Sequence, residues 1–447
     1  MLKNKLSITL FAFSTFILFY IFFQSEIILN GKMRTYYYIY YKLSAIFILF
    51  SIITFFLNKK LKEYFVIIIL SLVFSIYAFQ AYLTISYGGV TGLRQIEKKI
   101  ARAKEQRIEF QYRKKSEIYN ELKNNKYKNL KVSISPAIRI NEELRILPLA
   151  GVSNSITLNC NENGYYTIYK SDRYGFNNLD TEWDKKEIEF FLIGDSFVLG
   201  NCVNRPHDIS SVLKKISNKS VVNIGYANNG PLLEYASLRE YFLPKIKNII
   251  WIYTETSDLN NLRSELNSKI LKKYIEDMNF KQNLIYKQNE INYIVNRSID
   301  KWLESESNSY ELFEDKLGFR LKKFLSLWNT RELLFHSNLF ENKTEFNPPK
   351  EFKKIIELSK SLANKNNSNF YFVYLPSYSR YVKKIDNQEY EFIKKIINDL
   401  NINFIDIHEL VFKKETNPLK LFSFELPGHY TVDGYKKIGE AIYKNIK

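Results

Sequence analysis

Cysteine and histidine are scarce in this chain of 447 residues, which has only two cysteines and four histidines. So few ligands argue against a metal centre built from several thiolates and imidazoles. The two cysteines, Cys160 and Cys202, are either two free thiols, as in a cytosolic protein, or one disulfide in an oxidising compartment. The sequence leaves both alternatives open.

Arginine clusters, zinc-ligand spacings and aromatic-basic RNA motifs are also missing, although the formal net charge is +18. The excess charge lies on lysines scattered among Asn, Ile, Tyr and Phe along the whole chain. Nucleic-acid-binding domains concentrate positive charge on one face or in one motif. We therefore expect solvated helix faces and no nucleic-acid partner. The hydrophobic fraction of 46% excludes wholesale disorder and supplies a large core.

Charged residues are absent from two long apolar runs near the amino terminus, Leu6 to Phe23 and Phe65 to Ile85. Each run reaches the ~18 residues that are needed to cross a bilayer. Between them lies the shorter apolar run Leu43 to Leu57, which follows an aromatic stretch. Because no small-residue cleavage site follows Phe23, the first run reads as an anchor and not as a signal peptide. Residues 1–90 are therefore expected to form a membrane anchor with about three transmembrane helices.

The orientation of this anchor is less clearly encoded. Lysines flank the expected helices on both sides, so the positive-inside rule favours neither orientation. With a cytoplasmic amino terminus, three spans place the remainder of the chain outside the cytoplasm. We expect a multi-pass protein of a bacterial-type inner membrane with its large domain on the periplasmic or extracytoplasmic side.

A charged segment follows the anchor. Apolar residues recur at helical spacing through Leu93, Ile96, Ile100 and Ala103, and again at Ile118, amid dense Lys, Arg and Glu. One narrow apolar stripe on a charged helix predicts a helical stalk over residues 91–135. A coiled coil that binds a partner is the alternative.

Short β-rich runs alternate with helical stretches over residues 136–447. This alternation predicts an α/β domain with a doubly wound parallel sheet. The regularity breaks at about residues 259–350, where no clear strand occurs, and we expect a helical insertion or lid there. The expected strands are Ile188 to Ile193, Val221 to Ile224, Ile249 to Tyr253, Phe370 to Leu375 and Phe404 to Ile407.

The first of these strands ends in Gly194-Asp195-Ser196-Phe197. A tight turn at that point raises the Ser196 hydroxyl at the carboxyl edge of the sheet, where open α/β sheets bind their ligands. A serine is a poor nucleophile without a base and an oxyanion site. Three further segments lie at the same edge: the loop of Gly225, the segment Tyr253 to Asp258, and the loop of His429 before the last helix.

Serine first and histidine last, with glycine loops between them on a parallel sheet, resembles the SGNH or GDSL family of esterases and acyltransferases. The resemblance covers about residues 172–447 and implies a flavodoxin-like fold. It implies Ser196 as the nucleophile and His429 as the base. It also implies an oxyanion hole formed by the Ser196 N–H, Gly225 and Ser257, the last in the place of the family's asparagine. It implies no metal or cofactor.

The catalytic acid is missing from its usual place. The family's aspartate, three residues before the histidine, is Leu426 in this chain. Glu425 and Asp433 are the nearest carboxylates, and Asp406 lies near the end of the preceding strand. The acid is therefore unassigned, and a Ser-His dyad oriented by a backbone carbonyl is the alternative to a triad.

Two further segments, Ser171 to Phe176 and Phe372 to Pro376, resemble a membrane-anchored subset of this family that is encoded with surface-polysaccharide functions. The resemblance implies a serine esterase or O-acyltransferase for O-acetyl groups on an envelope polysaccharide or a lipid-linked glycan, with polysaccharide-assembly proteins as partners. Two alternatives stay open. One is an inactive domain that binds glycan or assembles a complex, and the other is a lipid esterase with residues 259–350 as an apolar lid.

Overall fold

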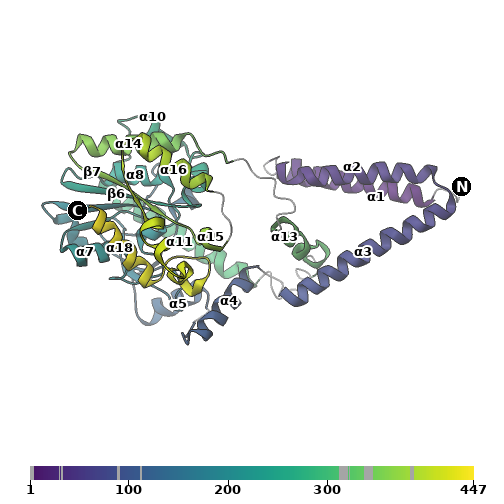
Figure 1. Ribbon diagram of the computed structural model, residues 1–447, viewed down its shortest axis with the longest axis horizontal. Coiled ribbons are helices and arrows are strands. Elements are labelled where there is room, and N and C mark those ends of the chain that lie inside the picture. The colour runs from purple at the N-terminus through teal and green to yellow at the C-terminus, as the bar shows by residue number, and fades with distance from the viewer. Residues whose placement is uncertain are drawn as a thin grey trace. The chain divides into compact units, whose positions relative to one another are not determined.

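The chain forms two compact units in the computed structural model, which describes residues 5–29, 31, 34–87, 91–110, 113–311, 321, 323–336, 346–382 and 387–446. The smaller unit consists of Met1–Gly89 and Leu321–Phe340. The larger unit consists of Val90–Arg320 and Glu341–Lys447 (Figure 1).

A five-stranded parallel sheet forms the centre of the larger unit, with the strand order β5-β4-β6-β7-β8. This order is the 2-1-3-4-5 order of flavodoxin-like doubly wound sheets. The predicted parallel α/β sheet is therefore confirmed. The strands are β4 (Ile188–Gly194), β5 (Val221–Asn223), β6 (Ile246–Thr254), β7 (Asn369–Leu375) and β8 (Asn403–Asp406).

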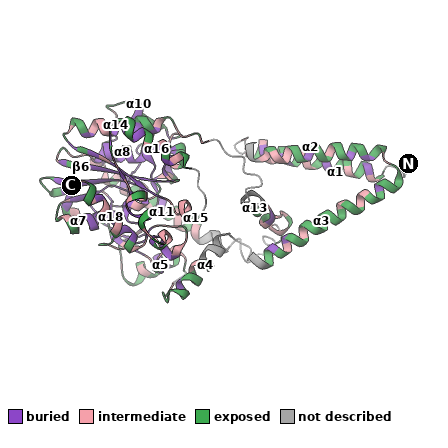
Figure 2. Ribbon diagram, viewed as in Figure 1, coloured by how far each residue is buried: buried purple, intermediate pink, exposed green. Residues whose placement is uncertain are grey.

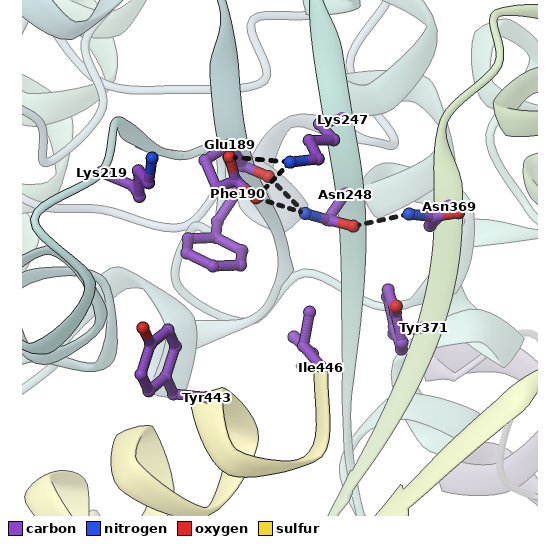
Figure 3. A pocket seen from close by; sticks show the side chains of 9 residues that line it. All are labelled: Glu189, Phe190, Lys219, Lys247, Asn248, Asn369, Tyr371, Tyr443 and Ile446. Atoms are coloured by element: carbon purple, nitrogen blue, oxygen red, sulfur yellow. Dashed lines mark hydrogen bonds and ion pairs between the residues drawn. The ribbon is translucent and has the colours of Figure 1, made fainter.

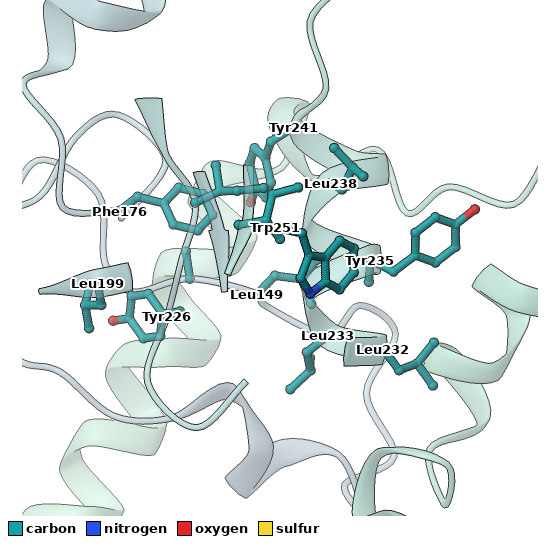
Figure 4. Close-up of a cluster of buried hydrophobic side chains, with 14 of the residues drawn as sticks. Leu149, Phe176, Leu199, Tyr226, Leu232, Leu233, Tyr235, Leu238, Tyr241 and Trp251 are labelled. Carbon is teal, nitrogen blue, oxygen red and sulfur yellow. The ribbon is translucent and has the colours of Figure 1, made fainter. Parts of the chain in front are cut away.

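Helices cover both faces of this sheet. Successive side chains of a strand point to opposite sides, so one strand can contribute to a hydrophobic cluster on each face. In β4, Phe191 and Ile193 belong to one hydrophobic cluster, whereas Phe190 and Leu192 belong to the other. Figure 4 shows part of the first cluster, around Trp251, and the central strands β4 and β6 are almost entirely buried (Figure 2). The first cluster packs under α8 (Pro231–Tyr241), α14 (Glu351–Lys365) and α16 (Gln388–Asp399), and the second under α7 (Ile209–Ser217) and α18 (Val432–Ile446) (Figure 1).

The described part of the expected insertion at residues 259–350 consists of helices joined by turns and irregular segments, and it contains no strand. It contains α9 (Asp258–Glu265), α10 (Lys269–Glu276), α11 (Gln288–Glu311) and α13 (Trp328–His336). Its last helix, α13, does not belong to the sheet domain, because it packs on the third apolar helix of the smaller unit. The insertion is therefore shared between the two units.

The smaller unit contains the three expected apolar helices, and all three are long and apolar enough to cross a membrane. They are α1 (Lys5–Phe22, continued by the π-helix Phe23–Ile28), α2 (Arg34–Phe56) and α3 (Lys59–Tyr87). Small hydroxyl residues join α1 to α2, as Ser14 and Ser51 do with Oγ atoms 3.4 Å apart. The Gln80 side-chain oxygen on α3 accepts hydrogen bonds from the backbone N–H (2.9 Å) and hydroxyl (2.8 Å) of Thr330 in α13.

The segment that was expected to form a stalk has a different structure. It contains two helices, α4 (Thr91–Glu105) and α5 (Lys115–Asn125), and Arg107 between them has a left-handed backbone with φ of 57°. Ile118 and Tyr119 of α5 are buried in the core of the larger unit. The amphipathic stripe of α5 thus faces the domain itself, and the expectation of one continuous helical stalk over residues 91–135 was wrong.

A small second sheet follows α5 and has the order β1-β2-β3. β1 (Leu130–Val132) pairs parallel with β2 (Ile156–Leu158), which pairs antiparallel with β3 (Ile168–Lys170). We call these three strands the accessory sheet. Its β2–β3 loop, residues 159–167, reaches the carboxyl edge of the large sheet, since Asn159 Nδ2 donates to Asn201 Oδ1 (2.9 Å) in the loop after Ser196.

The segment Ser171 to Phe176 joins the accessory sheet to the large sheet through the buried carboxylate of Asp172. This carboxylate accepts hydrogen bonds from Trp183 Nε1 (2.7 Å), Asn178 Nδ2 (2.8 Å) and two backbone N–H groups (2.8 and 2.9 Å). Asn178 in turn pairs with both backbone groups of Asn223 at the end of β5 (2.8 and 2.9 Å). The segment therefore fixes the end of β5, from which the Gly225 loop departs.

The Asp172→Ala substitution is expected to destabilise the protein by at least about 3 kcal/mol, because it leaves several buried donors without an acceptor. The thermal unfolding midpoint of the full-length protein in detergent should fall by at least about 5 °C. Asp180→Ala is the matched control, because Asp180 is partly exposed and pairs with Arg173 on the surface. Equal midpoints for the two variants would contradict the structural role of Asp172.

Candidate active site

Ser196 is the first residue of α6 (Ser196–Leu199), the short helix that follows β4 directly. Asp195 caps this helix, because its Oδ1 accepts a hydrogen bond from the Phe197 N–H (2.9 Å). Asp195 is therefore a turn residue that shapes the chain around the serine. The Ser196 residue is 7% exposed, so it lies at the sheet edge with little solvent around it.

His429 reaches Ser196 from the loop that precedes α18. A β-bridge between Phe422 and Tyr430 and a hydrogen bond from the Ser423 N–H to the His429 carbonyl (3.2 Å) hold this loop. His429 Nε2 lies 2.8 Å from Ser196 Oγ, and the Phe197 ring packs against the imidazole with centroids 4.7 Å apart. The structure thus brings together the predicted nucleophile and the predicted base.

The other imidazole nitrogen meets a carboxylate that the sequence did not single out. His429 Nδ1 lies 3.1 Å from Glu162 Oε2, and the same oxygen accepts the His429 backbone N–H at 2.5 Å. Glu162 lies in the β2–β3 loop of the accessory sheet. A Cβ atom at Gly428 would lie only 2.5 Å from Glu162 Oε2, so the glycine before the histidine permits this approach.

The carboxylates that were considered as the acid have other partners. Glu425 accepts from Asn417 Nδ2 (3.4 Å), Asp433 pairs with Lys437 (3.1 Å) and Asp406 accepts from the Tyr390 hydroxyl (2.5 Å). Glu425 and Asp433 are thus replaced by Glu162 as the carboxylate on the imidazole. Glu162 precedes the histidine by 267 positions, outside every block of the family resemblance. The one feature of the sequence that points to Glu162 is its position two residues after Cys160.

The Glu162 carboxylate and the His429 imidazole each favour the charged form of the other. Burial on its own would raise the pKa of Glu162, but the positive charge of His429 and its hydrogen bonds lower that pKa to about 2. Burial on its own would lower the pKa of His429, but the Glu162 carboxylate raises it above its ordinary value. Glu162 is therefore ionised at neutral pH and stabilises the imidazolium that forms when His429 accepts a proton.

Gly225 and Ser257, two of the predicted oxyanion residues, have other hydrogen-bond partners in the structure. The Gly225 N–H donates to Asn223 Oδ1 (2.8 Å), and a Cβ atom at Gly225 would lie 2.5 Å from Val198 Cβ in α6. Gly225 therefore allows the loop to pack against the helix that carries Ser196, and its place in an oxyanion hole stays a prediction. Ser257 precedes α9, where its Oγ accepts from Asn261 Nδ2 (3.3 Å), and its oxyanion role also stays a prediction.

The two cysteines form the disulfide Cys160–Cys202, which the sequence had left open. Cys202 Sγ lies 3.7 Å from His429 Nδ1. Glu162, Cys202 and His429 also bring potential metal-ligand atoms close together. Because the Cys202 sulfur is bonded to Cys160, it offers no thiolate to a metal ion in this structure.

A separate pocket of about 270 Å³ lies at the amino ends of the strands, on the edge of the sheet opposite Ser196 (Figure 3). Its polar side chains bind one another. Glu189 pairs with Lys247 (3.2 Å), Asn248 Nδ2 donates to the Glu189 carbonyl (3.0 Å), and Asn369 Nδ2 donates to Asn248 Oδ1 (2.9 Å). We assign no reaction to this pocket, because ligands of such sheets bind at the carboxyl edge.

Comparison with known proteins gives weak likenesses. No family model and no curated protein matches the chain. Among solved structures, a lipolytic protein of the G-D-S-L family from Desulfitobacterium hafniense DCB-2 is 14% identical, with a TM-score of 0.32, and the match covers 58% of this chain and 99% of that one. The acetyl xylan esterase AlAXEase is 10% identical, with a TM-score of 0.31, and the match covers 58% and 100% of the two chains. Likenesses this weak carry no argument, so the assignment of chemistry rests on the site itself.

The arrangement of Ser196, His429 and Glu162 has the geometry of a catalytic triad for nucleophilic catalysis by serine. With a proton on Nδ1 and a bond to Glu162, the imidazole presents an unprotonated Nε2 to the serine hydroxyl. Ser196 Oγ can then lose its proton to Nε2 as it attacks an electrophile.

The Glu162→Gln substitution is expected to slow the covalent labelling of Ser196 by a fluorophosphonate at least about tenfold. The acidic limb of its pH profile should move to lower pH, because removal of the carboxylate leaves burial to lower the pKa of His429. The measurement is the labelling rate of the full-length protein as a function of pH. Glu425→Gln is the matched control and should leave rate and profile unchanged. An unshifted profile in Glu162→Gln would exclude the carboxylate as the partner of the base.

Proposed function

We propose that this protein is a membrane-anchored serine esterase or O-acyltransferase. The observation that carries the proposal is the position of the His429 ring, which lies between Ser196 Oγ at 2.8 Å and Glu162 Oε2 at 3.1 Å. This geometry supports a mechanism in which Ser196 is the nucleophile, His429 is the base and Glu162 orients the base. An inactive domain would have no need to retain all three.

The proposed reaction proceeds in two halves. Ser196 Oγ attacks the ester carbonyl while its proton passes to His429 Nε2, and His429 then returns this proton to the leaving alkoxide. In the second half, His429 accepts a proton from water or from a sugar hydroxyl as that oxygen attacks the acyl group. The bond between the acyl group and Ser196 Oγ then breaks, and His429 returns the proton to Ser196 Oγ. Water makes the protein an esterase, whereas a sugar hydroxyl makes it an O-acyltransferase.

The oxyanion that develops on the carbonyl requires hydrogen-bond donors at the start of α6. The N–H of Ser196 belongs to the first turn of this helix, where backbone N–H groups have no partner within the helix. In the proposed mechanism it binds the oxyanion together with Ser257 and Gly225. The Gly225 N–H must then exchange its present acceptor, Asn223 Oδ1, for the oxyanion.

The proposed substrates are O-acetyl groups on an envelope polysaccharide or a lipid-linked glycan. The three long apolar helices support a membrane location, and the resemblance of Ser171 to Phe176 and Phe372 to Pro376 supports a glycan. The disulfide supports an extracytoplasmic catalytic domain, because disulfides persist in oxidising compartments.

The full-length protein in detergent is expected to hydrolyse p-nitrophenyl acetate. Ser196→Ala and His429→Ala should each lower kcat at least about 10³-fold, since each removes a group on which the covalent step depends. His207→Ala is the matched control and should keep the wild-type rate, because it removes an imidazole outside the catalytic group. Equal turnover by wild type and both site variants would reject a serine mechanism.

The proposed topology has a test of its own. Alkaline phosphatase fused after Tyr87 should be active in cells, because three spans place that residue outside the cytoplasm when the amino terminus is inside. A fusion after Phe56, which ends the second span, is the control and should be inactive. The reverse pattern would place the catalytic domain in the cytoplasm.

A further inference from the structure

The Cys160–Cys202 disulfide joins the two chain segments on which the candidate active site depends. Cys160 lies two residues before Glu162, the carboxylate on His429 Nδ1. Cys202 lies three residues after the end of α6, the helix that begins with Ser196. The disulfide therefore fastens the loop of the carboxylate to the segment of the nucleophile.

Besides the disulfide, the loop that carries Glu162 is held by side-chain hydrogen bonds, among them those from Asn159 Nδ2 to Asn201 Oδ1 (2.9 Å) and from the Tyr166 hydroxyl to the Arg113 carbonyl (2.8 Å). Its last backbone pairing is at its base, where the Thr167 N–H donates to the Cys160 carbonyl (3.0 Å). Beyond that point, Asn163 Nδ2 donates to the Cys202 carbonyl (2.7 Å), and Asn163 Oδ1 accepts from the Ser423 hydroxyl (2.7 Å). Without the disulfide, the position of this largely buried carboxylate would depend on side-chain hydrogen bonds of the loop, one of which ends on Cys202 itself.

Reduction of the disulfide to free thiols would also affect which nitrogen of His429 carries the proton. Cys202 Sγ lies 3.7 Å from His429 Nδ1, the nitrogen that donates its proton to Glu162. A Cys202 thiol could donate to an unprotonated Nδ1, which moves the ring proton to Nε2. An imidazole in that tautomer cannot accept the Ser196 proton. The sulfur of a disulfide has no proton to donate, so it leaves the productive tautomer in place.

We propose that the Cys160–Cys202 disulfide is a positioning element of the active site, which holds Glu162 on His429 and keeps a competing thiol away from the imidazole. The proposal rests on the proposed serine mechanism. The protein is then fully active only with the disulfide closed. A dithiol opens it by transferring two electrons and two protons: the S–S bond is replaced by two S–H groups, and the dithiol becomes a cyclic disulfide.

The test compares kcat and KM of full-length variants in detergent on p-nitrophenyl acetate, with a chelator present so that no metal binds the free thiols. Cys160→Ala/Cys202→Ala should lower kcat about 10-fold or more with little change in KM, because the effect is on the base. Added to Glu162→Gln, the double substitution should lower kcat no further than about twofold, since both act through one contact. Full additivity would overturn the proposal.

The single substitutions separate the two effects. Cys160→Ala leaves a Cys202 thiol beside His429 Nδ1, whereas Cys202→Ala leaves the thiol at Cys160. The kcat of Cys160→Ala should therefore be lower than that of Cys202→Ala, and both should be measured well below their unfolding midpoints. A purely structural disulfide would give equal losses.

A second measurement keeps this proposal separate from the proposed function. The pKa of His429 can be followed by NMR in protein with labelled histidine, because the chain has only four histidines. Loss of the disulfide should lower this pKa toward its value in Glu162→Gln, whether or not an ester is hydrolysed. An unchanged His429 pKa in Cys160→Ala/Cys202→Ala overturns the positioning role. Absence of Ser196-dependent hydrolysis in the oxidised wild type, with the pKa shifted as expected, overturns only the esterase proposal.

Discussion

The contact between the Glu162 carboxylate and His429 is the interaction on which the proposed chemistry depends. Its 3.1 Å bond to Nδ1 sets the tautomer, and its charge raises the pKa of the imidazole against the effect of burial. The same oxygen accepts the His429 backbone N–H, so it holds the loop as well as the ring. Ser196 gains a base only while this carboxylate stays in place.

The Glu162 carboxylate comes from a loop of the accessory sheet, so this sheet contributes to the candidate active site. In a sheet of the 2-1-3-4-5 order, the loops at the carboxyl edge supply most site residues, and here they supply Ser196 and His429. The acid comes instead from a hairpin loop that precedes the first strand of the large sheet. The buried Asp172 cluster and the Cys160–Cys202 disulfide join the accessory sheet to the large sheet on both sides of this loop. Both sheets therefore contribute residues to the proposed catalytic group.

The parts of the structure that the sequence predicts well are those with local signals. Apolar runs indicate the three long helices, and alternating strands and helices indicate the parallel sheet. Ser196 and His429 are recognisable because each lies in a motif at a strand or helix end. Glu162 carries no such motif, and its contact spans 267 positions of the chain. The stalk prediction was wrong because an apolar stripe such as that of α5 can be buried in its own domain as well as lie on an exposed helix. The contact between α13 and α3 through Gln80 could not be predicted, because it leaves no periodic pattern in the sequence.

The central claim is that Ser196 forms a covalent bond to the acyl group of the substrate, and trapping this intermediate tests it most directly. The full-length protein is mixed with an acetyl ester and quenched in acid within milliseconds, and its peptides are analysed by mass spectrometry. The account predicts an acetyl group on Ser196 in the wild type and none at that position in Ser196→Ala. Consumption of the ester by the wild type with no acyl group on Ser196 at any quench time would contradict it.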